Sequence, residues 1–145
     1  MKNIFFLFGL FLICNVLLSQ NGTYRCNIQR FTDENDPSRN KEHNNSMIIT
    51  IEVNEITGGS ILVTWLDDNT IYKWIVIRKF ETYVNEQGSV FNGYYARFSF
   101  ENVEANKQSI VSIIQDPKTN SLHLAISDPD TKTTNWYHYL TKINY

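Results

Sequence analysis

Two of the three histidines lie in strand-like segments on either side of a short polar loop. If residues 128–133 form the loop of a hairpin, His123 lies directly opposite His138. Two imidazoles in this arrangement are within reach of one metal ion, because imidazole is a common zinc ligand. The neighbours expected on the same face are Ser112 and Ile114, which supply no obvious third ligand. We therefore expect a pair of hydrated surface histidines and predict no metal site.

The cysteines predict no chemistry of their own. Cys14 lies in the N-terminal apolar run, so Cys26 is the one cysteine that remains if this run is removed. A nucleophilic thiol needs a neighbouring base or cation that makes it a thiolate, and no histidine is close to Cys26 in the sequence. We expect this thiol to be buried and inert. An intermolecular disulfide and a reactive group are the alternatives.

Carboxylates gather in turn-like segments. Asp67 and Asp68 look like an acid–base pair, but neighbouring residues of a strand face opposite sides, and in a turn both face water. The acidic segments 33–36 and 128–130 could hold calcium, yet they lack the spacing and the final Glu of an EF-hand. The sequence also lacks the common hydrolase, metalloprotease, phosphate-binding and dithiol motifs. We predict no catalytic residue and no cofactor, and therefore a protein that is not an enzyme.

A predicted hairpin around Asp68-Asn69 gathers large aromatic side chains. It pairs Trp65 with Tyr72 and Val63 with Trp74, and loops of two or four residues give the same pairing. Six residues then share one face: Ile61, Val63, Trp65, Tyr72, Trp74 and Val76. Such rings either fill a small core or line a partly open barrel that takes a small apolar ligand. The candidate ligand-binding residues are Trp65, Tyr72 and Trp74.

The elements that would position these residues are short strands. Runs rich in Ile, Val, Thr, Tyr and Trp alternate with clusters of Asp, Asn, Gly and Pro, a pattern typical of strands and tight turns. The predicted strands are 23–31, 47–54, 60–66, 70–80, 94–100, 109–115, 121–127 and 135–143. Tight turns make successive strands antiparallel neighbours. We therefore predict an all-β fold, an antiparallel meander of about eight strands that either curls into a small barrel or folds into a sandwich.

Three segments leave alternatives open. Within residues 81–93 the chain turns either at 85–88, which gives two long strands, or at 92–93, which gives an extra hairpin. Residues 101–115 place several apolar side chains on one helical face, although their β-branched types favour a strand. Residues 33–45 are polar and almost free of apolar side chains, so we expect a flexible loop.

The first twenty residues resemble a targeting segment. Lys2 precedes an apolar run over residues 4–18, and small polar residues follow it. This layout is typical of a signal peptide, and the run is shorter than the ~20 apolar residues of a membrane-spanning helix. We expect residues 1–20 to be a signal peptide and residues 21–145 to form a single all-β domain without a membrane span. An uncleaved anchor and lipid attachment at Cys14 are the alternatives.

A meander that begins with Gly22-Thr23-Tyr24 resembles the general outline of lipocalin-type barrels, a likeness of fold that implies no residue roles. The 13 basic side chains are scattered among 15 acidic ones and the net charge is −2, which argues against nucleic-acid binding.

We predict a secreted, periplasmic or cell-surface binding module for a small hydrophobic or amphipathic ligand. The alternative is a protein-interaction, inhibitory or carbohydrate-binding domain that acts on an extracellular partner through surface aromatics such as Tyr94, Tyr95 or Trp136. An open edge strand would allow a homodimer.

Overall fold

The computed structural model describes residues 20–100 and 103–144, with the side chains of 103–106 left aside. The predicted signal peptide therefore lies outside the described residues, apart from Gln20. The described part of the chain has no helix that is long and apolar enough to cross a bilayer. Its elements are β1 (Gly22–Cys26), β2 (Ile28–Asp33), the 3₁₀ turn η1 (Pro37–Arg39), β3 (Lys41–His43), β4 (Met47–Asn54), β5 (Gly58–Trp65), β6 (Ile71–Val84), β7 (Val90–Phe100), β8 (Val103–Asp116), β9 (Ser121–Asp128) and β10 (Thr133–Lys142).

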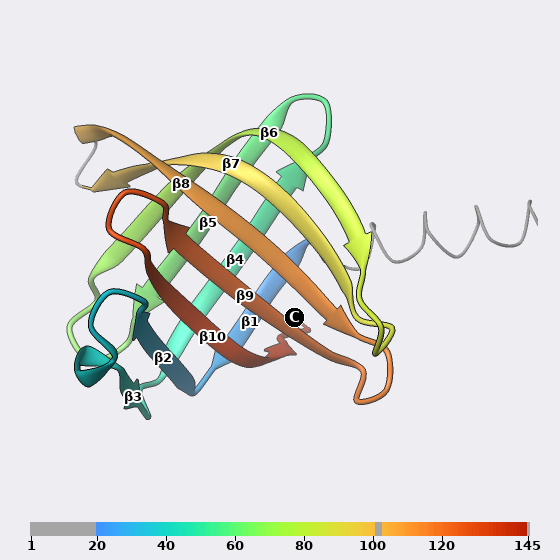
Figure 1. The fold of residues 1–145 in the computed structure, drawn as a ribbon, viewed down its shortest axis with the longest axis horizontal. Coiled ribbons are helices and arrows are strands. Elements are labelled where there is room, and N and C mark those ends of the chain that lie inside the picture. The colour runs from blue at the N-terminus through green and yellow to red at the C-terminus, as the bar shows by residue number, and fades with distance from the viewer. Residues whose placement is uncertain (1–19, 101–102, 145) are drawn as a thin grey trace, which may run out of the picture.

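Eight of these strands form a closed antiparallel barrel (Figure 1). Its order is β1-β4-β5-β6-β7-β8-β9-β10, and β1 pairs back onto β10 through Tyr24 opposite Lys142. Strand β2 continues from β1, pairs with the first half of β10, and carries β3 on its other side. The all-β prediction is confirmed, and of its two forms the barrel is the one observed.

Closure of the barrel removes most of the backbone edges that an open sheet would expose. Among the described strands, β3 is the edge strand next to β2, and it spans only the three exposed residues Lys41–His43. Short and charged edge strands pair poorly with a second copy of a chain. The edge on which the predicted homodimer depends is therefore short.

Aliphatic side chains fill the middle of the barrel because alternate residues of each strand point inward. On β4 these are Met47, Ile49 and Ile51, and on β5 they are Ile61 and Val63; all five are fully buried. The strands bury one face and expose the other, which is the alternation that identified them in the sequence.

The structure decides between the alternatives left open along β6 to β8. The chain turns at residues 85–88, where the side-chain carbonyl of Asn85 accepts the backbone N–H groups of Gln87 and Ser89. The result is the pair of long strands β6 and β7. The segment with helical periodicity is the strand β8, in agreement with its β-branched composition.

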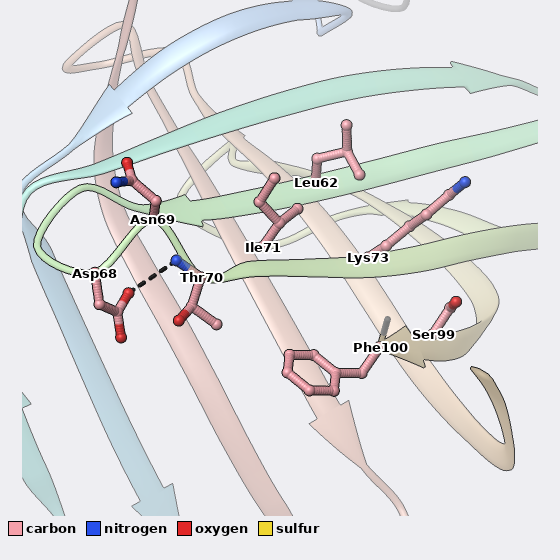
Figure 2. A pocket seen from close by; sticks show the side chains of 8 residues that line it. All are labelled: Leu62, Asp68, Asn69, Thr70, Ile71, Lys73, Ser99 and Phe100. Atoms are coloured by element: carbon pink, nitrogen blue, oxygen red, sulfur yellow. Dashed lines mark hydrogen bonds between the residues drawn. The ribbon is translucent and has the colours of Figure 1, made fainter. Parts of the chain in front are cut away.

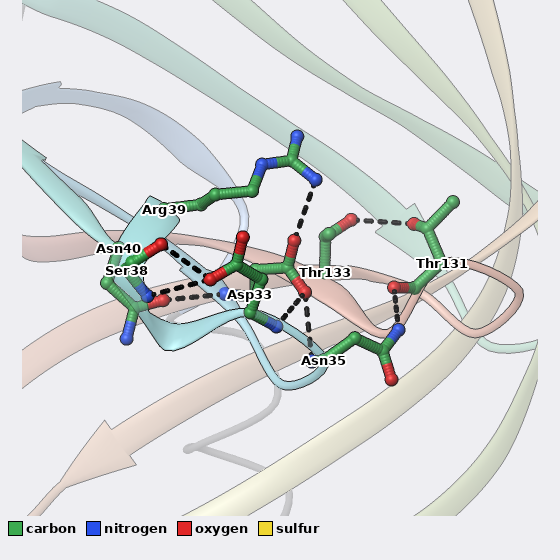
Figure 3. A network of polar contacts seen from close by, with 8 residues as sticks. Asp33, Asn35, Ser38, Arg39, Asn40, Thr131 and Thr133 are labelled. Carbon is green, nitrogen blue, oxygen red and sulfur yellow. Dashed lines mark hydrogen bonds and ion pairs between the residues drawn. The ribbon is translucent and has the colours of Figure 1, made fainter.

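Residues 33–45, predicted as a flexible loop, have more regular structure than expected (Figure 3). The buried carboxylate of Asp33 accepts the backbone N–H groups of Asn35 and Asp36 and forms an ion pair of 2.9 Å with Arg39. The Asn35 side chain also donates to the carbonyl of Thr131 at 3.0 Å. Side-chain bonds to the backbone thus organise a segment that has almost no apolar residues.

Candidate ligand pocket

The β5–β6 hairpin carries the predicted aromatic face, with a register shifted by two residues from the prediction. Val63 lies opposite Tyr72 and Ile61 opposite Trp74, whereas the sequence predicted Trp65 opposite Tyr72 and Val63 opposite Trp74. The backbone N–H of Trp65 donates to the backbone carbonyl of Thr70 at 2.9 Å, which closes a loop over residues 66–69. A shift of two residues preserves the face of each side chain. All six predicted residues belong to or pack against the interior cluster.

Turn chemistry explains this register. The carboxylate of Asp68 accepts the Thr70 backbone N–H at 2.9 Å (Figure 2), and this bond lowers the pKa of the exposed Asp68 carboxyl. Asn69 has a positive φ of 57°, which asparagine tolerates well. The prediction that Asp67 and Asp68 lie in a turn is confirmed, but the turn begins one residue earlier than predicted.

A pocket of about 290 Å³ opens beside the predicted rings. It is lined by Gln29, Trp65, Tyr72, Trp74, Phe98, Asn135 and Tyr137. These residues come from β2, β5, β6, β7 and β10, at the end of the barrel that carries the connections 66–70 and 129–132 (Figure 1). We call this end the mouth. The structure places all three predicted ligand-binding residues around this pocket; their binding of a ligand stays a prediction.

One wall of the pocket is aromatic. The Tyr72 ring lies 6.4 Å from the Trp74 ring and 6.0 Å from the Phe98 ring, measured between centroids. The Trp74 and Phe98 rings are 5.3 Å apart. These separations and tilts are within the range that aromatic pairs prefer, so the three rings form one apolar surface.

The other wall is polar and comes from β2 and β10. The side-chain amide Nε2 of Gln29 donates to the side-chain oxygen Oδ1 of Asn135 at 2.9 Å, and Gln29 is only 7% exposed. Two polar atoms of the lining are buried without a partner among the described residues: the Gln29 oxygen Oε1 and the Trp65 indole Nε1. Buried donors and acceptors are usually paired in folded proteins, so two unpaired groups on one pocket require an explanation.

Burial also governs the phenol of this wall. Tyr137 is 3% exposed, and its pKa is raised by burial first and then by its proximity to Cys26 and Tyr72. Loss of a proton from Tyr137 would create a charge in a poorly hydrated place. The phenol therefore stays neutral across the physiological range.

The sequence analysis missed four lining residues, Gln29, Phe98, Asn135 and Tyr137, as parts of a site. Asn135 could have been found, because it shares a strand face with Tyr137 in the predicted last hairpin, and a polar residue on a core face is unusual. Gln29 could not have been found, because alternation continued from β1 would turn its side chain outward. The buried residues of β1, Tyr24 and Cys26, have even numbers, and the break between β1 and β2 brings the odd-numbered Gln29 to the inside.

A smaller pocket of about 160 Å³ shares Trp74, Phe98 and Asn135 with the first one. It extends toward β8 and β9, where the ammonium of Lys107 and the carboxylate of Asp128 form an ion pair. The mouth therefore has an apolar and amide-lined part beside Trp65 and a separate part bordered by paired charges.

A larger pocket, of about 500 Å³, lies on the outer side of the same hairpin (Figure 2). Leu62, Ile71 and Lys73 line it and alternate with the interior residues of β5 and β6. The described side chains around it hold no buried polar atom without a partner. This outer pocket is larger than the mouth pocket. The mouth pocket is nevertheless the better candidate for a ligand site, because two buried polar atoms of its lining have no partner.

The two histidines meet as the last hairpin predicts, on the outer face of the barrel. His123 Nδ1 and His138 Nδ1 are 3.4 Å apart, and Ile114 lies opposite His123 on β8. Burial lowers the pKa of both imidazoles; the neighbouring His138 lowers that of His123 further, and Arg30 that of His138. Within the described ranges, no cluster of three or more His, Cys, Asp or Glu side chains could hold a metal ion.

Two predicted positions of tyrosines are wrong. Alternation along the predicted strand 135–143 places Tyr139 on the core side together with Tyr137. Tyr139 is instead 61% exposed with a φ of 54°, because the β9–β10 register shifts between Tyr137 and Leu140, and Leu140 is buried in its place. Tyr94 was expected at the surface, yet it is 3% exposed, since it points inward on β7. Burial, with a smaller effect of Glu55, raises the pKa of Tyr94 to about 12.

The thiol of Cys26 is fully buried, as predicted. It donates to the carbonyl oxygen of Ile28 at 3.2 Å and lies 3.4 Å from the carbonyl oxygen of His138. Burial raises the pKa of this thiol, so the thiolate is disfavoured. Cys26 is therefore a packing residue of the barrel wall.

No protein-family model matches this sequence, and a search of curated proteins finds no match. The functional argument therefore depends on the geometry and chemistry of the pocket.

Proposed function

We propose that this protein is an exported, non-enzymatic binding module that holds a small apolar or amphipathic ligand in the mouth pocket. The observation that carries the proposal is the convergence of Trp65, Tyr72 and Trp74 on one space of about 290 Å³. Ligand sites of this kind combine a mostly apolar wall with a few polar groups that fix orientation. The mouth pocket has both features, in its rings and in its amides.

The lining favours binding over catalysis. Its polar groups belong to two amides, two phenols and two indoles, and the phenol of Tyr137 is kept neutral by burial. General acid–base chemistry needs a group whose pKa lies near the working pH. The pocket lining offers orientation and apolar contact to a ligand instead.

Export is the second part of the proposal, and it is supported by the N-terminal apolar run together with the position of Gln20. The carbonyl oxygen of Gln20 accepts the Tyr24 hydroxyl at 2.9 Å, and Gln20 is 2% exposed. Because Gln20 packs with the domain, we propose cleavage between Ser19 and Gln20, one residue before the boundary expected from the sequence. Sequencing the N-terminus of the exported product should give Gln20 as the first residue, and an intact Met1 would contradict the proposal.

Thermal-shift and native mass-spectrometric screens against lipids and hydrophobic metabolites test the binding role. We expect at least one compound to raise the melting temperature and to remain bound in the gas phase. Trp74→Leu should weaken this binding because it removes part of the ring wall, whereas Leu66→Ala, outside the lining, should not. A protein that takes up none of these compounds would contradict the proposal.

A second candidate function uses the outer face of the β6–β7 hairpin. Tyr83 and Phe91 stack there with centroids 4.5 Å apart, and Phe80 and Tyr95 are 4.7 Å apart. Tyr83 is 47% exposed, so this hairpin could contact an extracellular protein or the face of a sugar. Tyr95, unlike Tyr94, remains a candidate for this role.

Glycan arrays and pull-downs from extracellular fluid separate this candidate from the first. Tyr83→Ser should abolish binding through the hairpin and leave the mouth pocket unchanged. Trp74→Leu should have the opposite effect. Retained partner binding in the Tyr83→Ser variant would contradict the second candidate.

A further inference from the structure

The two unpartnered polar atoms of the mouth pocket are of opposite kinds. Trp65 Nε1 is a hydrogen-bond donor, and Gln29 Oε1 is an acceptor. Each is buried, and Gln29 as a whole is more than nine-tenths buried, so bulk water does not reach these atoms freely. A bound molecule that accepts from the indole and donates to the amide oxygen would satisfy both.

The volume of the pocket limits the size of that molecule. Liquid water occupies about 30 Å³ per molecule, so a space of about 290 Å³ holds roughly ten water-sized groups. This is the size of one six-membered ring with a short substituent. A long acyl chain would not fit and would extend out of the pocket.

The lining of the pocket also disfavours a charged ligand. None of the described residues that line the pocket is acidic, basic or a histidine. The nearest ion pair, Lys107 with Asp128, belongs to the neighbouring pocket, and its two charges face each other. The raised pKa of Tyr137 shows that burial opposes a negative charge here. A charged ligand would lose its hydration without gaining a counter-charge.

We propose that the ligand is a neutral single-ring molecule that accepts a hydrogen bond from Trp65 Nε1 and donates one to Gln29 Oε1. This inference rests on the proposed function, because it assigns a ligand class to the same pocket. The ring contacts Tyr72, Trp74 and Phe98, and the polar substituent faces the amide wall.

Three small probes with the same ring test the proposal by isothermal titration calorimetry. Benzamide is neutral and carries both a donor and an acceptor, toluene has neither, and benzoate is charged. We expect benzamide to bind at least tenfold more tightly than toluene, because toluene leaves both buried atoms unpaired. We expect benzoate to bind at least tenfold more weakly than benzamide at pH 7.

A matched pair of variants assigns the effect to the pocket. Trp65→Phe keeps a ring but removes the indole N–H, and should reduce benzamide affinity at least fivefold while leaving toluene affinity within twofold. Trp136→Phe removes an indole on the outer face, whose N–H donates to Thr32 Oγ1 at 3.2 Å, and should change neither affinity.

The outcomes distinguish the two levels of the proposal. If toluene binds as tightly as benzamide, or if Trp65→Phe does not weaken benzamide, the neutral donor–acceptor ligand is wrong while an apolar pocket stands. If benzoate binds best, the neutrality of the ligand is wrong. If none of the three probes binds, the proposed ligand class is wrong, and the binding function is contradicted as well only if the thermal-shift and mass-spectrometric screens find no ligand.

Discussion

The middle and the mouth of this barrel are built from different side chains. In the middle, Ile49, Ile61 and Val63 are fully buried and pack as aliphatic layers. At the mouth, wide rings and two amides surround a space of about 290 Å³. Aliphatic side chains can fill an interior to high density, whereas the rings and amides of the mouth leave this space between them. We infer that the middle supplies stability, and we propose that the mouth holds the ligand.

Polar groups show the same contrast. The fully buried aliphatic side chains carry no hydrogen-bonding group, while at the mouth Trp65 Nε1 and Gln29 Oε1 are buried without partners. The other two such atoms among the described residues, Gln20 Nε2 and Asn92 Nδ2, do not line this pocket. Unpaired buried groups lower stability, so a sequence that retains two of them on one pocket is consistent with a functional site.

The largest effect should come from the middle. Ile61→Ala removes a fully buried side chain and leaves a cavity, so we expect a loss of about 2–5 kcal/mol in the free energy of unfolding. Urea denaturation followed by circular dichroism measures it. Ile56→Ala, at a side chain that is 94% exposed, is the control. A loss below about 1 kcal/mol for Ile61→Ala would mean that the middle is not tightly packed.

A moderate effect is expected from the polar network that supports the β2 side of the mouth. Asp33→Ala leaves the N–H groups of Asn35 and Asp36 without their acceptor, and should lower stability by about 1–3 kcal/mol. Faster amide hydrogen exchange over residues 33–40 should accompany the loss. Asp130→Ala, at an exposed loop position, is the control. Unchanged exchange in the Asp33 variant would show that the network does not hold this segment.

Two indole substitutions sharpen the contrast between a paired and an unpaired N–H. Trp136→Phe removes a hydrogen bond to Thr32 and should cost about 0.5–1.5 kcal/mol beyond the lost ring area. Trp65→Phe removes an indole N–H that has no acceptor among the described residues. In the absence of ligand it should therefore lower the free energy of unfolding by less than Trp136→Phe does. The reverse order of the two denaturation midpoints would contradict an unpaired Trp65.

The smallest effect should be a pH dependence from the outer face. Burial lowers the pKa of His123 and His138 below the ordinary value of 6.5, so the unfolded chain binds more protons than the folded one just below pH 6.5. Stability should therefore be full above pH 6.5 and fall as the pH drops through the lowered pKa values. In the His123→Gln/His138→Gln variant the melting temperature should depend less on pH between 7.5 and 5.5. An equal dependence in both proteins would assign it to other groups.

The parity of the strands could be predicted from the sequence, because the hydrophobic alternation around Trp65 and Trp74 fixes which side chains share a face. Details set by single backbone conformations could not. The loop at Asn69, the bulge at Tyr139 and the break after Cys26 each depend on a local turn that alternation does not encode. The ring wall of the pocket was therefore predictable, whereas Gln29 on the opposite wall was not.

The central claim is that the mouth pocket takes up a small ligand beside Trp65. A ¹H–¹⁵N NMR titration with benzamide tests it directly, because the three indole N–H groups of the chain give separate signals. The Trp65 signal should shift and saturate, while the Trp136 signal, from the outer face, should stay unchanged. A Trp65 signal that does not move, or that moves no more than the Trp136 signal, would contradict the account.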